Sequence, residues 1–316
     1  MKKLTLLLTI LLFATFGCEK LMKDENILVD DPELQAFSDG LNADVGLSKS
    51  STNALNDALN RHGKDGKHRR DPGFLWKVAA EMQSKLSDDE KSRLFSWMDD
   101  NSVPYLYGGG MDRKDRGGPG GDKGGSNVRL IYELLDEAQR ESLKNILETY
   151  GTKMRDLMEQ AKAGTIDRDT AKAEIEALEA AMEAEIEGLL TDDQKQQLAD
   201  IKAEIENRMA EAKQAAHDAM VNALEMTSEQ ETGLAEINTA HQEAMNTLFE
   251  KAKAEEMEKD DLHEAVKLLL ADRNSKMDEL FNDKQMEIIK IYTALGMQYN
   301  RHCGQKDRDG QKGDNR

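Results

Sequence analysis

Histidine and cysteine, the residue types best suited to metal binding or catalysis, occur in this sequence, but their spacing indicates neither a metal site nor a catalytic site. The six histidines form no His-x-x-x-His pair, and no pair of Glu-x-x-His motifs occurs as a di-iron bundle requires. His62 and His68 in a basic stretch, and His302 beside Cys303, are open only to loose metal binding. No nucleophile motif or phosphate-binding loop is present. We therefore expect no catalytic residue, no enzyme activity, no cofactor and no metal site.

Cys18 is the residue for which the sequence predicts a chemical modification. Lys2 and Lys3 precede an apolar run over residues 4–16, which is shorter than the roughly 20 residues that a membrane span needs. The run ends at Gly17 and Cys18, a pattern that resembles the lipidation site of bacterial lipoproteins. We expect a signal peptide over 1–17, lipid on Cys18 and a tether over 18–31. The alternative is an ordinary cleaved signal peptide; either start exports the chain to the periplasm or cell surface.

Composition favours long, solvated helices. The chain is 33% charged and only 5% aromatic, and its formal net charge is −19. Such acidity argues against nucleic-acid binding, because phosphate contacts require concentrated Lys and Arg. The acidic charge favours basic protein partners, or else serves only to keep the chain soluble.

A recurring motif predicts where the helices begin. An apolar residue is followed by Ser, Thr, Asp or Asn, two variable positions, Gln or Glu, and then Leu or Ile four residues later. The first polar side chain can accept a hydrogen bond from the N3 backbone N–H, and the Gln or Glu can reach back to the N-cap N–H. The instances are Ser87 with Glu90, Asp136 with Gln139, Thr191 with Gln194, Thr227 with Gln230, and Asn282 with Gln285; Ser48 with Ser51 is a weaker sixth.

The motifs also reveal an internal duplication. A shift of 91 residues (230 − 139) aligns residues 135–201 with 226–292 without a gap, and the apolar positions match. Each segment predicts a helix, a short turn, a second helix and a capped third helix. In this alignment His241 takes the place of Tyr150 on an apolar stripe, so we interpret it as a packed histidine. We expect an all-α fold of long antiparallel amphipathic helices in tandem helical-hairpin repeats, with a Gly-rich linker and a disordered tail.

The run Leu190-Thr191-Asp192-Asp193-Gln194, followed by Leu198, resembles the Leu-Thr-x-x-Gln signature of the Spy/CpxP family of extracytoplasmic stress proteins. The resemblance covers about residues 80–300. It implies an ATP-independent chaperone or stress sensor that holds unfolded proteins on a curved helical surface. It also implies antiparallel dimers, so a homodimer is open to this chain as well.

These observations together predict a lipid-anchored, chaperone-like protein of the envelope stress response, with unfolded or basic proteins as its partners. The membrane is contacted through the N-terminal lipid only. The alternative is a structural or metal-responsive envelope sensor without clients. Methionine adapts to varied partners, and the candidate client-binding residues are Met154, Leu157, Met158, Met245, Leu248 and Phe249.

The predicted organisation has seven parts. They are a signal peptide (1–17), a tether (18–31), a degenerate N-terminal helical unit (32–100), a Gly-rich linker (101–128), helical unit 1 (129–225), helical unit 2 (226–298) and a polar tail (299–316).

Overall fold

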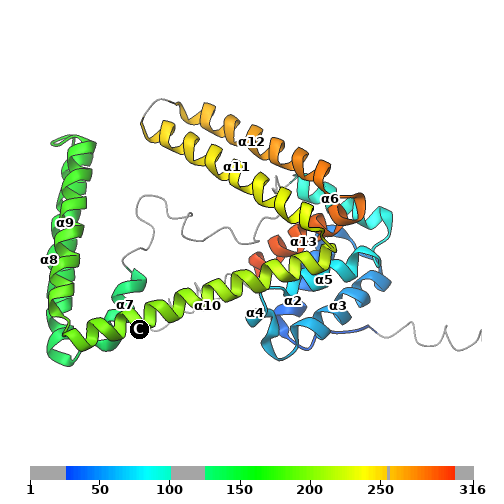
Figure 1. The fold of residues 1–316 in the computed structure, drawn as a ribbon, viewed down its shortest axis with the longest axis horizontal. Coiled ribbons are helices and arrows are strands. Elements are labelled where there is room, and N and C mark those ends of the chain that lie inside the picture. Colours follow the sequence, from blue (N-terminus) through cyan, green and yellow to red (C-terminus); the bar gives the residue numbers. More distant parts are fainter. Residues whose placement is uncertain (1–25, 101–124, 255–256, 303–316) are drawn as a thin grey trace, which may run out of the picture. The chain divides into compact units, whose positions relative to one another are not determined.

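The computed structural model describes residues 26–100, 125–254 and 257–302, and these residues are helical, with no strand among them (Figure 1). They divide into two compact units. The larger unit takes Met1–Met111 and Ala212–Arg316, and the smaller unit takes Asp112–Glu211. Helix α10 (Asp192–Leu224) contributes residues to both units.

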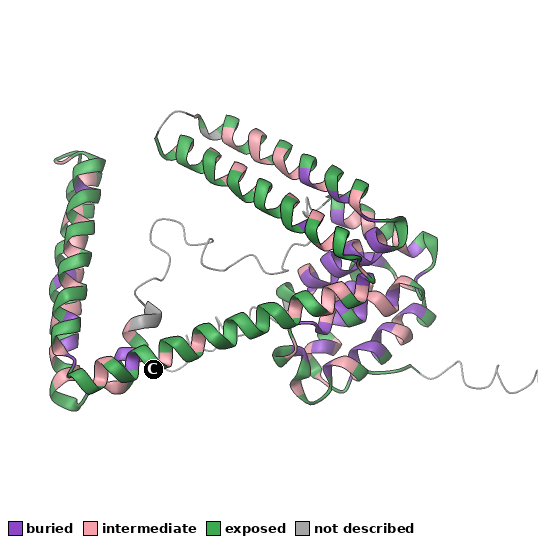
Figure 2. Ribbon diagram, viewed as in Figure 1, coloured by how far each residue is buried: buried purple, intermediate pink, exposed green. Residues whose placement is uncertain are grey.

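The larger unit contains most of the buried apolar side chains. Its helices are α2 (Pro32–Val45), α3 (Lys49–Gly63), the 3-10 turn η1 (Lys64–Gly66), α4 (Lys67–Arg70), α5 (Phe74–Gln83), α6 (Asp88–Asp100), α11 (Ser228–Lys253), α12 (Lys259–Leu280) and α13 (Asp283–His302). Helix α13 packs against α2, α5 and α6. The ring of Trp76 stacks on that of Tyr292 with centroids 3.8 Å apart. Figure 2 shows buried positions concentrated in α2, α3, α5, α6 and α13, and sparse along α11 and α12.

The smaller unit has a much thinner core. Helix α7 (Gly125–Leu134), α8 (Glu137–Lys162), α9 (Arg168–Leu189) and the start of α10 form it. Its buried apolar side chains include one small cluster near the chain reversals, formed by Ile131, Leu135, Leu143, Ile186, Leu190 and Leu198, while Tyr150 and Ala171 are buried outside that cluster.

Each unit contains one long antiparallel hairpin. The first hairpin is α8 with α9, and the second hairpin is α11 with α12. The bounds of α11 lie 91 residues after those of α8 (228 − 137), and α12 follows α9 by the same interval (259 − 168). Two helices alone cannot enclose a core, so the apolar stripes of both hairpins remain largely half-buried.

Three observed boundaries differ from those predicted from the sequence. Residues 26–31 of the expected tether are held against α3: Asn53 and Asn60 accept hydrogen bonds from the backbone N–H groups of Ile27 and Asp30. Helix α7 begins at Gly125, inside the expected linker 101–128. Helix α13 continues to His302 rather than ending before 299, because the ring of Tyr299 packs against Phe37.

The rest of the expected linker (101–124), Cys18 with the signal peptide, and the tail from Cys303 onward lie outside the described residues. Among the helices that are described, none combines the length and apolar character needed to cross a membrane.

Candidate functional site: paired helix caps and two hairpins

A helix begins immediately after each of the capping residues singled out in the sequence. Helices α6, α8, α10, α11 and α13 begin one residue after Ser87, Asp136, Thr191, Thr227 and Asn282, and α3 begins one residue after Ser48. In the five strong motifs, the side chain at N3 accepts a hydrogen bond from the N-cap N–H, and the N-cap oxygen accepts one from the N3 N–H. Each motif thus satisfies two backbone donors that a helix terminus would otherwise leave unpaired.

The structure shows that these motifs also meet in pairs. In the smaller unit, the Gln139 amide nitrogen donates to Gln194 Oε1 at 2.9 Å, and the Gln194 nitrogen donates back to Gln139 Oε1 at 2.8 Å. The second N–H of each amide reaches a main-chain carbonyl, Leu189 O at 2.6 Å and Leu134 O at 2.8 Å. With the N-cap bonds included, each amide makes four hydrogen bonds, the full capacity of two donors and one carbonyl oxygen.

The larger unit contains the same arrangement. Gln230 and Gln285 exchange hydrogen bonds at 2.9 and 3.0 Å. Their remaining N–H groups donate to Leu280 O at 3.1 Å and Leu224 O at 2.8 Å. Gln285 is only 5% exposed, so these bonds are made largely away from water. We call these two arrangements the first and second Gln pairs. Each joins the start of one hairpin helix to the start of the helix that follows the hairpin.

A third pair, built from different residues, lies in the N-terminal helices. Glu90 takes the place of one Gln and Ser51 that of the other, and the Ser51 hydroxyl donates to Glu90 Oε2 at 2.8 Å. The side chain of Ser51 is too short to reach the backbone N–H of Ser48, the N-cap residue of its own helix. Glu90 Oε1 accepts that bond instead, from the Ser48 N–H at 2.7 Å. The weak sixth motif therefore works only because the opposite motif supplies a carboxylate.

The buried carboxylate of Glu90 is held in its charged form. It is 3% exposed, and burial alone would raise its pKa. Hydrogen bonds from the backbone of Ser48 and Ser87 and from the hydroxyls of Ser51 and Ser87 outweigh burial and lower the pKa from 4.5 to about 2. The charge is therefore compensated by hydrogen bonds and stabilises both helix starts.

The candidate client-binding residues lie on the hairpins, but they do not share one environment. Met154, Leu157, Met245 and Leu248 are half-buried. Met158 and Phe249 are 50% and 52% exposed, and they occupy equivalent positions (249 − 158 = 91), each four residues before the end of its helix, α8 or α11. Leu268 on α12, which the sequence analysis did not single out, is 63% exposed. Its neighbours Leu269 and Leu270 concealed it in the sequence, since a continuous apolar run does not show which face is solvated.

The second hairpin places polar groups where the first has apolar ones. Tyr150 in the first hairpin is buried, and its hydroxyl donates to Glu185 at 2.8 Å. At the equivalent place the second hairpin has His241, half-buried beside Arg273, which is 6% exposed and donates to Asn238 at 3.0 Å. Burial, together with the Arg273 charge, lowers the pKa of His241. His241 thus lies on the apolar stripe as the alignment predicted, but in a polar environment.

Comparisons of the chain with family models, with curated proteins and with solved structures found no match. The class of protein that the structure itself defines is an all-helical one in which long hairpins start from hydrogen-bonded pairs of helix caps.

Proposed function

We propose that this protein is an exported, lipid-anchored binding protein of the envelope stress response that holds unfolded or basic proteins without ATP. Anchoring through Cys18, the Spy/CpxP-like relationship and the tandem character of the two hairpins belong to this proposal. The observation that carries it is the pair of exposed apolar residues at equivalent positions, Met158 and Phe249. Large apolar side chains on a charged helical surface are suited to contact with apolar segments of other proteins.

The composition of the hairpins supports the same function. Between Leu234 and Met277, no apolar side chain of the described second hairpin is fully buried, so its stripe remains accessible along its length. The net charge of −19 attracts basic clients before apolar contact is made. The Gln pairs fix the starts of the hairpins, while the hairpins themselves keep apolar surface available to a client.

An aggregation assay with the full chain tests this function. At stoichiometric ratio and without ATP, the protein should suppress aggregation of unfolded clients. It should capture basic clients faster than acidic ones, and this preference should shrink between about 0.1 and 1 M salt, where the Debye length falls from about 10 to about 3 Å. If neither basic nor acidic clients are protected, the chaperone function is wrong and the structural or sensor alternative replaces it.

Two exposed substitutions locate the client surface. Phe249→Ser with Met158→Ser should weaken client affinity about tenfold, which corresponds to the loss of about 1.4 kcal/mol of contact. Circular dichroism should remain unchanged, because both side chains are half exposed. Glu250→Ser is the matched control: it changes an exposed neighbour of Phe249 and leaves the apolar surface intact. Equal protection by the wild type, the double variant and Glu250→Ser would show that clients do not bind at Met158 and Phe249.

A further inference from the structure

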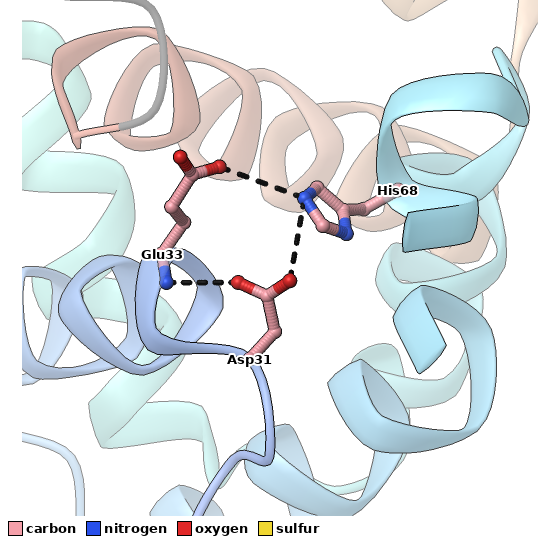
Figure 3. A group of neighbouring side chains, drawn as sticks. All are labelled: Asp31, Glu33 and His68. Carbon is pink, nitrogen blue, oxygen red and sulfur yellow. Dashed lines mark hydrogen bonds and ion pairs between the residues drawn. The ribbon is translucent and has the colours of Figure 1, made fainter. Parts of the chain in front are cut away.

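A second potential site lies at the start of α2, far along the chain from Met158 and Phe249. Figure 3 shows the imidazole of His68 directed between the carboxylates of Asp31 and Glu33. His68 Nε2 lies 3.8 Å from Asp31 Oδ2 and 3.7 Å from Glu33 Oε2. One oxygen from each carboxylate and this nitrogen all lie within 4.8 Å of one another. The three side chains come from the N-cap of α2, its second residue, and α4.

The His68 nitrogen is buried and lacks a hydrogen-bond partner. The side chain is 1% exposed, and Nε2 makes no hydrogen bond within the described part of the chain. The other ring nitrogen, Nδ1, lies 3.2 Å from the Gly63 carbonyl oxygen. A carbonyl only accepts, so Nδ1 carries the proton, and in neutral imidazole Nε2 then presents a lone pair to the two carboxylates. A backbone carbonyl fixes the orientation of metal-binding histidines in the same way.

We propose that Asp31, Glu33 and His68 bind a divalent transition-metal ion of the zinc class. Two ligand atoms about 2.1 Å from a tetrahedral zinc ion lie about 3.4 Å apart. The two nitrogen–oxygen distances of 3.7 and 3.8 Å are close to this value, and the two carboxylate oxygens, which lie within 4.8 Å of each other, can close on an ion by side-chain rotation. Two carboxylates neutralise the charge of the ion. An imidazole nitrogen favours zinc, nickel or copper over magnesium and calcium, which prefer oxygen ligands. Three protein ligands leave one coordination position for water.

The surroundings allow an ion to enter. The side chains of Asp31 and Glu33 are 29% and 16% exposed, so the carboxylates are reached from solvent while the imidazole is not. The guanidinium of Arg69 lies 2.6 Å from Glu33 Oε2, the same oxygen that faces His68, and is itself 62% exposed. Arg69 therefore competes with a metal for Glu33. This site is independent of client binding, since it involves neither hairpin.

Zinc titration of the full chain by calorimetry tests the site. The wild type should bind one zinc ion. Each of the substitutions Asp31→Asn, Glu33→Gln and His68→Gln should lower the zinc affinity by more than the roughly 10–100-fold that is lost when a hydrogen-bond partner of a ligand is removed. Asp31→Asn is the most informative variant. Asp31 Oδ1 caps α2 by accepting from the Glu33 N–H at 2.8 Å, and asparagine retains a capping oxygen. Arg69→Gln should tighten binding, because it removes the competing cation.

His62→Gln is the matched control, since His62 lies in the same basic stretch but pairs with Glu81 at 2.6 Å. Its zinc affinity should equal that of the wild type. Zinc should also raise the melting temperature of the wild type but not of Asp31→Asn, because the ion links α2 to α4 only in the former. Bound cobalt should show no thiolate charge-transfer band, which separates this site from the two cysteines. Wild-type affinity in Asp31→Asn and Glu33→Gln, or loss of binding in His62→Gln, would overturn the proposal.

Discussion

The two Gln pairs are nearly identical in their hydrogen bonds, but the helices that follow them have very different surroundings. After the second pair, α13 buries Met286, Ile288, Ile289, Ile291, Tyr292, Ala294 and Leu295. The equivalent residues of α10 are Lys195, Gln197, Leu198, Asp200, Ile201, Ala203 and Glu204, and only Leu198 is buried. The same capping geometry thus begins one helix that enters a large core and one that is mostly solvated. Hydrogen bonds specify where the helices start and meet, and apolar burial determines how much stability each start receives.

The largest expected difference concerns the matched residues Ile289 and Leu198. Ile289→Ala should lower the free energy of unfolding of the larger unit by about 4 kcal/mol, because Ile289 is 0% exposed in a dense core. Leu198→Ala should cost about 2 kcal/mol, because Leu198 is 8% exposed in a small cluster. Urea unfolding, with hydrogen exchange followed by mass spectrometry, measures both. Equal losses, or loss of protection throughout the chain from Leu198→Ala, would remove the distinction between the two regions.

Glu90 makes the third pair sensitive to pH, because a carboxylate forms the contact between the two motifs there, whereas neutral amides form it in the two Gln pairs. Its folded pKa of about 2 lies below the ordinary value of 4.5, so the unfolded chain binds more protons between these values. The stabilisation, about 3 kcal/mol at most, is complete above pH 4.5 and is lost as the pH falls towards 2. Urea unfolding of the wild type and Glu90→Gln between pH 7 and pH 2.5 measures the difference.

Glu90→Gln should be less stable than the wild type at pH 7, although Gln occupies this position in the other four motifs. Its NH₂ group would face the N–H of Ser48 or Ser87, two donors that need an acceptor. The difference in the free energy of unfolding between the wild type and Glu90→Gln should become smaller as the pH falls. A constant difference at every pH would show that the Glu90 charge does not stabilise the pair.

The sequence predicted the helix starts but not their pairing. The capping motifs are local signals, so Asp136 with Gln139 could be recognised within four residues. The bond between Gln139 and Gln194 depends on the intervening hairpin, and the equal 55-residue spacing of both Gln pairs (194 − 139 and 285 − 230) was its only trace.

The packing of α13 and the Asp31–Glu33–His68 cluster were harder to predict. The motif at Asn282 predicted where α13 begins but could not identify α2, α5 and α6 as its partners. Asp31 caps α2 whereas His68 lies on α4, and no short motif joins them. Three-dimensional packing, rather than any local pattern, brings such residues together.

The helix caps act in pairs, and a double-mutant cycle on Gln230 and Gln285 measures the coupling within one pair. Methionine is similar in shape to glutamine but cannot form the hydrogen bonds of its amide group. The variants Gln230→Met and Gln285→Met therefore each remove one amide, and the double variant removes both. The exposed bond between Gln242 and Asn246, 2.9 Å long within α11, serves as the control pair. We expect a coupling of about 1–3 kcal/mol for Gln230 with Gln285 and no more than about 0.5 kcal/mol for the control. Additivity within about 0.5 kcal/mol at the Gln pair would contradict this expectation.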